Sequence, residues 1–326
     1  MDLKAKILNI KDKKEFQTLA LEIFHHQYKN NIVYRQWCDL VCKGPVVDVR
    51  DIPFLPISFF KTHNVSTLDA NLAEDYFLSS GTSNMTRSKH NVFSKQFYID
   101  NTISCFEQFY DKTSSYCYIC LLPNYLEQQH SSLICMMDNF VKASRYKHSG
   151  FFKDNLIDVA DILAENEHFG IESVLFGVTY ALLDLIELKK MQLKNTIVFE
   201  TGGMKGRRQE TSKKELHKIL KTGFGIESIA SEYGMCELFS QAYAIKDGIF
   251  HTPKQMQVVI KPINDPMGEN LVNHNGIINI IDLANVDTCS FIQTEDIGLQ
   301  HEDGSFEIIG RIDHSALRGC NLMYNS

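Results

Sequence analysis

The sequence predicts an α/β protein, with a body built on a mostly parallel sheet and a β-rich C-terminal part. Two observations predict this class. Apolar strand-like runs alternate with helical stretches between about residues 116 and 231. After about residue 245 the runs become short and β-like, with glycine and asparagine between them. A hydrophobic share of 44% in 326 residues is enough for a large core.

The N-terminal stretch predicts a helix and then an extended connection. Apolar residues recur there at helical spacing, namely Phe16, Leu19, Ala20, Ile23 and Phe24. Pro53 and Pro56 exclude a long helix after them and favour an extended, packed chain. We therefore expect residues 1–75 to form a lead segment packed on the core.

Strands and helices are expected to alternate through a body that spans residues 76–245. The expected strands are 116–122, 172–178, 195–201 and 226–231, and the expected helices are 131–145, 179–192 and 211–223. Ser131 or Ser132 is suited to cap the first of these helices. Ser212 and Glu215 match a capping box at the start of the last one, and Gly223 is suited to end it.

The β-rich part is expected over residues 246–310, before a tail of residues 311–326. Its β-like runs are "GIFHTPKQMQVVIKPI", "NGIINIIDLA", "CSFIQTEDIGLQ" and "GSFEIIGRI". Short runs of this kind, separated by turn residues, are typical of hairpins. We expect them to form a small barrel or sheet packed on the body.

Charge and composition exclude several classes of partner. The net charge is −7 and the pI is about 5.9, so no nucleic-acid partner is expected. No apolar run approaches the roughly 18 residues that would predict a membrane span. The N-terminus is not typical of a signal peptide, and the odd number of cysteines favours reduced thiols, so we expect a cytoplasmic protein. Cys117 and Cys120 would face opposite sides of a strand, which favours buried thiols over a zinc site.

A hydroxyl-rich loop is the first candidate site. "LSSGTSNMTRSK" contains Ser79, Ser80, Gly81, Thr82 and Ser83, followed by Arg87 and Lys89. Hydroxyls and backbone N–H groups around a glycine are suited to hold phosphate. The P-loop pattern does not match, because no Gly-Lys-Ser/Thr follows. A polar turn explains the same residues equally well.

Four further stretches are candidate sites. The first two follow expected strands, where ligands bind in parallel sheets, and the other two lie later in the chain. "ETGGMKGRRQE" places Gly202 and Gly203 directly after an expected strand. "SEYGMCELFSQ" places Glu237 just after a glycine turn. "TEDIG" and "GRIDHSALRGCNL" complete the set. Taken singly, each is also compatible with an ordinary loop.

In this order, the stretches resemble the motifs of the adenylate-forming enzymes, over roughly residues 50 to 322. The resemblance implies that the hydroxyl-rich loop holds the β,γ-phosphates of ATP, with positive charge from Arg87 or Lys89. It implies that Gly202 and Gly203 lie against the adenine, and that Tyr233, Gly234 and Glu237 match a Tyr-Gly-x-Thr-Glu motif whose glutamate binds Mg²⁺. Asp296 matches the aspartate that accepts from the ribose hydroxyls, and Arg311 the arginine that donates near the ribose.

A narrower resemblance is to the acyl-protein synthetase (LuxE) family, carried by "IPFLPISFFKTH", "ETGGMKGRRQE", "SEYGMCELFSQAY" and "RGCNL". It implies an ATP- and Mg²⁺-dependent ligase that activates a fatty or other carboxylic acid as acyl-AMP and accepts the acyl group on Cys320. The implied partner protein is an acyl reductase or an acyltransferase. The implied fold is the adenylate-forming N-terminal-type core, without the usual mobile C-terminal lid domain.

The sequence departs from the superfamily at several positions. Asn84 replaces a glycine of the loop, Thr86 and Arg87 stand where Pro-Lys is usual, and Cys236 replaces a threonine. The lysine of the lid has no counterpart, and Lys61 is a candidate substitute for it, although such lysines beside aromatic residues are usually structural. Two alternatives stay open: transfer to CoA or a carrier protein, as in phenylacetate-CoA-ligase-like enzymes, and a non-catalytic adenylate-binding subunit.

Overall fold

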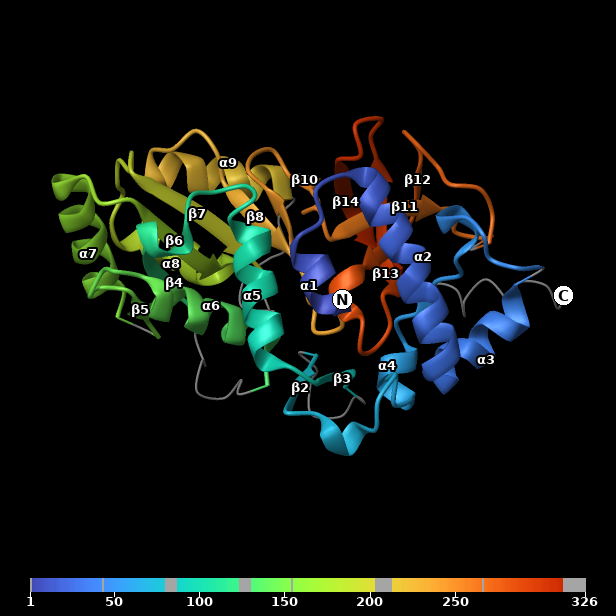
Figure 1. Cartoon of the computed structure of the whole chain (residues 1–326). Helices are drawn as coiled ribbons and strands as arrows, with labels where there is room; N and C mark the ends of the chain where they lie inside the picture. The colour runs from blue at the N-terminus through green and yellow to red at the C-terminus, as the bar shows by residue number, and fades with distance from the viewer. Residues whose placement is uncertain are drawn as a thin grey trace, which may run out of the picture.

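One long mixed sheet organises the molecule (Figure 1). The computed structural model describes residues 2–42, 44–79, 87–122, 130–153, 155–202, 213–265 and 267–312. Within these residues the sheet has twelve strands, in the order β11-β12-β13-β14-β10-β9-β8-β7-β6-β4-β5, and β1 pairs with β13 beside that path. The two halves of this order differ in strand direction.

The half that ends at β5 is parallel, as the alternation of runs predicts. Its strands are β4 (Cys117–Leu121), β5 (Gly150–Phe151), β6 (Ser173–Val178), β7 (Thr196–Thr201) and β8 (Ala230–Tyr233). Parallel strands that are buried on both faces need apolar residues at nearly every position. Both β4 and β6 are buried along their whole length. The carboxyl ends of β4, β6, β7 and β8 therefore meet at one edge.

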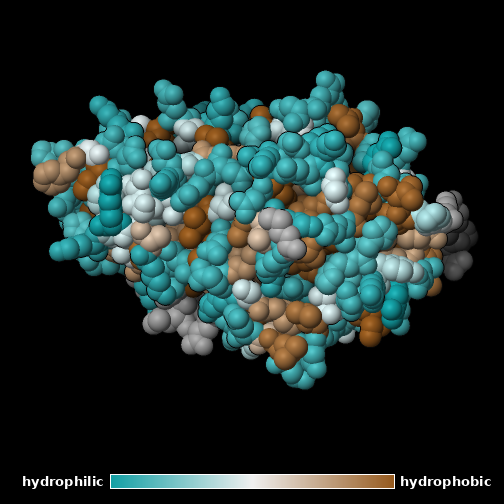
Figure 2. All heavy atoms as spheres, in the orientation of Figure 1, coloured by the Kyte–Doolittle hydropathy of each residue, from teal (hydrophilic) through white to brown (hydrophobic). Residues whose placement is uncertain are grey.

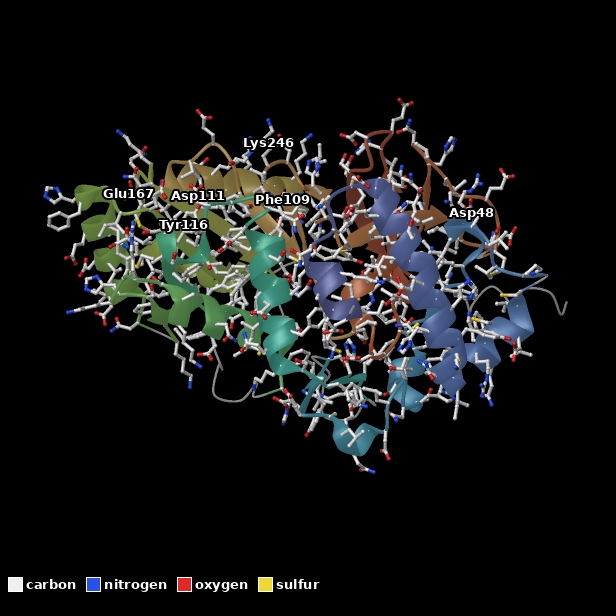
Figure 3. The ribbon with its side chains drawn as sticks, in the orientation of Figure 1. Asp48, Phe109, Asp111, Tyr116, Glu167 and Lys246 are labelled. Atoms are coloured by element: carbon white, nitrogen blue, oxygen red, sulfur yellow. The ribbon has the colours of Figure 1, made fainter. Side chains whose placement is uncertain are left out.

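Helices cover both faces of the parallel half (Figure 1). They are α5 (Lys95–Phe106), α6 (Ser132–Ala143), α7 (Leu156–Phe169), α8 (Thr179–Leu188) and α9 (Lys213–Phe224). Under α5 and α6 the core is aromatic: Phe199 of β7 lies 6.5 Å from Phe106 and 5.3 Å from Phe176, between ring centroids. At the outer end, the Glu167 carboxylate of α7 accepts from the backbone N–H groups of Lys194 and Asn195 and fixes the start of β7 (Figure 3).

The β-rich part continues the same sheet in antiparallel pairing. Its strands are β9 (Ala242–Ala244), β10 (Ile249–His251), β11 (Met256–Lys261), β12 (Asn275–Asp282), β13 (Phe291–Gln300) and β14 (Phe306–Arg311). The sequence predicts hairpins here, and β11–β14 form a meander in which β13 is central. The expected separate barrel or packed sheet is wrong, because β9 pairs with β8 and β10 pairs with β14, which joins the two parts.

The N-terminal segment packs on the antiparallel half. It comprises α1 (Leu3–Leu8), α2 (Lys13–Asn30), α3 (Ile32–Val41), β1 (Leu55–Pro56) and α4 (Phe59–Thr62). The predicted apolar stripe of α2 is buried, which confirms that helix. Buried Gln27 fixes α2 in place: its amide donates to the carbonyls of Asn285 and Val286 and accepts from the Ser290 N–H.

A hairpin that the sequence does not predict carries the base of the hydroxyl-rich loop. It pairs β2 (Asp75–Leu78) with β3 (Lys89–Val92). Short 3₁₀ helices complete the described structure: Val49–Asp51, Ala70–Leu72, Thr113–Ser115 and Leu283–Asn285.

Helix ends follow the expected chemistry, with one correction. The Ser131 hydroxyl accepts from the Ile134 N–H and caps α6 as predicted. The prediction that Gly223 ends α9 is wrong: the helix continues to Phe224, and Gly225 follows it with a φ of 65°. Gly223 instead allows close helix packing, because a Cβ there would lie 2.6 Å from the Ile186 Cβ of α8. Ser212 lies outside the described residues, so the capping box stays a prediction.

The strand expected over residues 226–231 starts later, as β8 at Ala230. The Ile226 N–H donates to the Lys221 carbonyl and closes the end of α9, which takes that residue away from the sheet. Cys117 and Cys120 are buried in β4, as predicted.

Hydrophilic residues predominate on the face shown in Figure 2, with hydrophobic patches between them. In the part of the chain that the structure describes, every helix is too short or too polar to cross a bilayer.

Candidate functional site

A cavity of about 590 Å³ lies at the edge where the parallel strands end. The ends of these strands line it through Leu122, Val178, Thr201, Gly202 and Tyr233. Ligands of open α/β sheets bind at this edge, in the crevice that opens where the connections after neighbouring strands leave to opposite faces of the sheet. The cavity brings together seven residues predicted for the site: Ser79, Gly202, Tyr233, Gly234, Glu237, Asp296 and Arg311.

Tyr233, Asp296 and Arg311 form one contact network on the wall made by the antiparallel half. The Tyr233 hydroxyl donates to Asp296 Oδ2 at 2.8 Å. Asp296 and Arg311 face each other in the β13–β14 register, with Arg311 Nε 3.9 Å from Asp296 Oδ1. Arg311 also pairs with Glu295 at 3.1 Å and keeps 68% of its side chain exposed. The aspartate is therefore held by a neutral donor, while the arginine can turn to a ligand.

Burial raises the pKa of Asp296, and the Tyr233 hydroxyl and the nearby Arg311 charge oppose that shift. Burial also raises the pKa of Tyr233, followed by the charge of Asp296, so the phenol stays a neutral donor. A carboxylate with one bound donor and free lone pairs is a good acceptor for sugar hydroxyls. The pair is thus suited to hold a ribose.

Buried hydrogen bonds fix the backbone around Glu237. The Asn285 amide donates to the Glu237 carbonyl at 2.8 Å. Asp282 accepts from the N–H groups of Phe239 and Ser240, each at 2.8 Å. These bonds hold the turn after β8, so Glu237 keeps its position on the cavity wall with only 5% of its surface exposed.

Cys236, which departs from the superfamily motif, packs inward. Its thiol lies 3.9 Å from the Ser88 carbonyl. Burial first, and then the Glu237 charge, raise the pKa of that thiol, which stays protonated. The His90 ring bonds the Cys236 carbonyl and the Thr288 hydroxyl, each at 2.8 Å, and burial lowers the pKa of His90 to about 4. A neutral histidine therefore joins β3 to the turn that carries Glu237.

The hydroxyl-rich loop starts and ends at the cavity. The Ser79 N–H donates to the Ser88 carbonyl, and the Ser88 N–H donates to the Ser79 hydroxyl at 3.0 Å. Both serines line the cavity, whereas Arg87 is exposed and lies outside its lining. Ser80, Gly81, Thr82 and Ser83 lie outside the described residues.

Gly202 follows β7 with a φ of 74°, a conformation that favours glycine. The Thr179 hydroxyl lies 3.3 Å from its carbonyl and also bonds the buried carboxylate of Glu200. Gly203 and Cys320 lie outside the described residues, so their places stay predictions. Lys61 does line the cavity, and its Nζ is 4.0 Å from Glu295.

The sequence motifs do not identify several residues that shape the site. His90, Asp282 and Asn285 hold the Glu237 turn, but no short motif surrounds them. Glu232 and Gln241 line the cavity as well. Glu232 stands directly before Tyr233, so its place beside a predicted site residue is the one signal that points to it.

A Mg²⁺ ion fits the donor set only together with a substrate. In the described ranges, no group of three or more His, Cys, Asp or Glu residues is placed to hold a metal. Mg²⁺ commonly needs just one or two carboxylates, with waters and substrate phosphates completing its shell. Glu237 is suited to that role.

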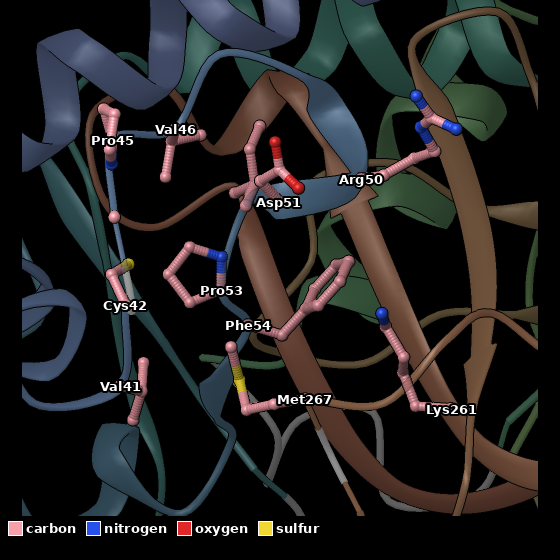
Figure 4. A pocket seen from close by; sticks show the side chains of 12 residues that line it. Val41, Cys42, Pro45, Val46, Arg50, Asp51, Pro53, Phe54, Lys261 and Met267 are labelled. Carbon is pink, nitrogen blue, oxygen red and sulfur yellow. The ribbon is translucent and has the colours of Figure 1, made fainter.

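A second hollow of about 350 Å³ lies apart from these residues, beside the connection after α3 (Figure 4). Pro45, Val46, Pro53 and Phe54 line it together with Lys261 of β11. The Lys261 amine donates to the Gly268 carbonyl at 2.7 Å, so it already has a hydrogen-bond partner. None of the residues predicted for the site lines this hollow.

Comparison with known sequences supports the narrower resemblance. The family model described as acyl-protein synthetase, LuxE, matches residues 6–105. A long-chain-fatty-acid–luciferin-component ligase of Vibrio harveyi is 46% identical over 61 residues, 18% of this chain and 16% of that protein. A ligase of the same description from Photorhabdus luminescens is 35% identical over 68 residues, 21% of this chain and 59% of that protein. The chain thus spans less than two thirds of either relative, and the predicted resemblance to the LuxE family is confirmed.

Comparison with solved structures identifies the fold. A 2-hydroxyisobutyryl-CoA ligase in complex with its acyl-AMP matches with a TM-score of 0.65 and 10% identity, covering 94% of this chain and 70% of that one. ATP-bound MatB from Rhodopseudomonas palustris matches with a TM-score of 0.56 and 14% identity, covering 75% of this chain and 49% of that one. At such identities the likeness concerns the fold. The predicted α/β core of the adenylate-forming enzymes is confirmed.

Proposed function

We propose that this chain, with a LuxE match in its first third and the adenylate-forming fold, is an ATP-dependent acyl-protein synthetase. One observation carries the proposal: Gly202, Tyr233, Glu237, Asp296 and Arg311 line a single cavity beside the base of the hydroxyl-rich loop. These residues come from separate strands and from the turns that follow strands. Their convergence on one edge supports a site for a nucleotide and an acid.

The first step would be formation of an acyl adenylate. An oxygen of the carboxylate attacks the α-phosphorus of ATP, the bond to the β-phosphate breaks, and pyrophosphate leaves. Catalysis of this kind depends on positioning and on charge neutralisation. In the proposal the loop from Ser79 to Ser83 and Arg87 hold the phosphates, and Glu237 holds Mg²⁺, which neutralises phosphate charge. Asp296 and Arg311 hold the ribose, and Gly202 and Gly203 lie against the adenine.

The second step would move the acyl group to sulfur. The Cys320 thiolate attacks the acyl carbon and AMP leaves, so that a thioester remains for a partner acyl reductase or acyltransferase. A thiolate is needed because the thiol is a poor nucleophile. Labelled acid with ATP and Mg²⁺ should give a hydroxylamine-sensitive acyl-protein that Cys320→Ala abolishes. Retained labelling in this variant would contradict the role of Cys320.

Carboxylate-dependent exchange of pyrophosphate into ATP tests the first step alone. Wild-type protein should exchange with a medium- or long-chain acid, and Asp296→Asn should lower kcat/KM for ATP by roughly tenfold or more. Asp247→Asn is a matched control, because Asp247 is an exposed aspartate that pairs with Lys221 and does not line the cavity. Absence of exchange with every acid would exclude the adenylation proposal.

A further inference from the structure

A buried polar cluster lies at the end of β7, two residues before Gly202. Glu200 of β7 and His217 of α9 are each 6% exposed, and Thr179 at the start of α8 is 2% exposed. The proposed function uses the glycines of "ETGG" and gives no role to the glutamate before them. Charged and polar groups that are buried this deeply need partners, so their contacts are informative.

Glu200 faces two basic groups. Its Oε2 lies 3.7 Å from His217 Nε2, a buried ring nitrogen that has no hydrogen-bond partner among the described residues. The Lys213 amine is near as well: burial lowers the pKa of Lys213, and the Glu200 charge opposes that shift. A buried carboxylate needs basic groups of this kind around it. The cluster is therefore suited to keep a negative charge behind Gly202.

The Thr179 hydroxyl lies between two acceptors. Its oxygen is 2.5 Å from Glu200 Oε1 and 3.3 Å from the Gly202 carbonyl oxygen. A hydroxyl carries one hydrogen, and an ionised carboxylate can only accept. Hydrogen bonds to a charged acceptor are shorter and stronger than those to a neutral one, so Glu200 takes the hydrogen of Thr179.

The Gly202 carbonyl is then left without a donor. In the part of the chain that the structure describes, Thr179 is the one group placed to donate to it. Gly202 is exposed and lines the cavity, so a ligand can reach it. Without the carboxylate, the Thr179 hydroxyl would turn to this carbonyl and occupy it. Glu200 thus controls, from behind the cavity wall, whether the carbonyl is available to a ligand.

We propose that Glu200 is a positioning residue that draws the Thr179 hydrogen to itself and leaves the Gly202 carbonyl to accept an N–H group from the base of the nucleotide. The inference rests on the proposed function, because it concerns base recognition in the same cavity. A free acceptor selects a purine that carries an amino group. A purine with hydrogen or with a carbonyl oxygen at that position leaves the acceptor unpaired.

Calorimetric titration of three magnesium-bound triphosphates tests the inference without any acid. ATP carries the amino group, purine riboside triphosphate carries hydrogen in its place, and ITP carries a carbonyl oxygen. The variants are Glu200→Leu, Glu200→Gln, Thr179→Val and the double variant Glu200→Leu/Thr179→Val. Glu227→Leu is the control for an exposed glutamate, and Thr222→Val for a hydroxyl that donates to a helix carbonyl.

Wild type and both controls should bind ATP at least tenfold more tightly than purine riboside triphosphate, and ITP most weakly. Glu200→Leu should reduce the preference for ATP to threefold or less, because Thr179 then donates to Gly202. Glu200→Gln keeps an acceptor for Thr179 and should keep most of the preference. Thr179→Val should keep it too, and the double variant should recover it to within threefold of wild type, because no hydroxyl remains to occupy the carbonyl.

Recovery in the double variant separates positioning from a merely structural role, in which the second substitution would add to the damage. An unchanged preference in Glu200→Leu, or a double variant no better than Glu200→Leu, would overturn the proposal. Should Glu200→Leu not fold, loss of the preference in Thr179→Val would overturn it as well. Wild type that binds ATP without preferring it over purine riboside triphosphate contradicts this inference alone, whereas wild type that binds no nucleotide contradicts the proposed function.

Discussion

At the scale of single residues, the pairing of Tyr233 with Asp296 is the contact on which nucleotide binding would depend. The phenol donates at 2.8 Å and lowers a carboxyl pKa that burial raises. Asp296 accepts from a ribose in its ionised form, so binding weakens as the pH falls through its pKa. Tyr233 thus helps to set the pH range over which Asp296 is ionised and can bind a ribose.

Tyr233→Phe should raise the pKa of Asp296 further and move the loss of ATP binding to higher pH. Near pH 6 the KM for ATP should rise by roughly tenfold, the value of one hydrogen bond to a charged group. KM for ATP across pH 5.5–8.5 in the exchange assay measures it. Tyr28→Phe is the matched control, because Tyr28 donates to Asp39 at 2.7 Å on the surface. Identical pH profiles for Tyr233→Phe and wild type would contradict the role.

The Glu232 carboxyl predicts a pH-dependent gain in stability for Glu232→Gln. The folded-state pKa of about 7 lies above the unfolded value of about 4.3, so the folded protein holds a proton that the unfolded chain releases. The wild type therefore loses stability as the pH rises from about 4.3 to about 7, relative to the variant. Urea unfolding should show a gain on the order of 1–3 kcal/mol at pH 8 and almost none at pH 4. A gain that does not depend on pH would exclude an ionising cause.

At the scale of elements, the sequence predicts strands and helices best where one periodicity dominates. The strands β4, β6 and β7 and the helix α2 appear as expected, because continuous apolar runs and a helical stripe leave no competing arrangement. The β2–β3 hairpin is not predicted, since its four-residue strands are too short for a pattern. The end of α9 differs because the packing partner of Gly223 lies on another helix.

The residues of the site divide in the same way, into those that lie in local motifs and those that only the fold brings together. Tyr233, Glu237, Asp296 and Arg311 lie in local motifs, and the sequence predicts them. His90 and Asn285 bond the same turn from distant strands and connections, and no spacing along the chain reveals such contacts. Glu232 lies directly before a motif residue, but its place on the cavity wall follows only from the fold.

Gly223→Ala should destabilise the protein although alanine favours helices. The added Cβ would lie 2.6 Å from the Ile186 Cβ, and overpacking of this kind costs about 1–3 kcal/mol. Thermal and urea unfolding measure the loss, and the double variant with Ile186→Ala should recover part of it. An equal or higher stability of Gly223→Ala would show that α8 and α9 pack less closely.

At the scale of the whole molecule, the cavity lies where two hydrophobic cores meet. One core lies under the helices of the parallel half, and the other lies between the N-terminal helices and the antiparallel strands. Tyr233 belongs to the second core and contacts Phe250 and Phe306 at ring distances of 6.0 and 5.6 Å. The N-terminal segment therefore supports the site from a distance.

Gln27→Ala should weaken the packing of the N-terminal segment on the antiparallel half. Removal of the amide leaves the buried N–H of Ser290 and the Val286 carbonyl without their partner, at about 1–3 kcal/mol for each unpaired group, whereas the Asn285 carbonyl still accepts from the Thr288 N–H. Urea unfolding should show a loss of at least about 1 kcal/mol, and hydrogen exchange should rise in residues 285–290 and around Glu237. Gln17→Ala, at an exposed position of α2, is the matched control. A loss no larger than in the control would contradict the anchoring role.

The most direct test of the central claim is a crystal structure of the protein with a non-hydrolysable acyl-adenylate analogue. The account predicts that the ribose lies against Asp296 and the adenine beside Gly202. The acyl chain should lie along the side chains of α5 and α6 that line the cavity. An analogue bound elsewhere, such as in the hollow beside Lys261, or an empty cavity at saturating analogue, would contradict it.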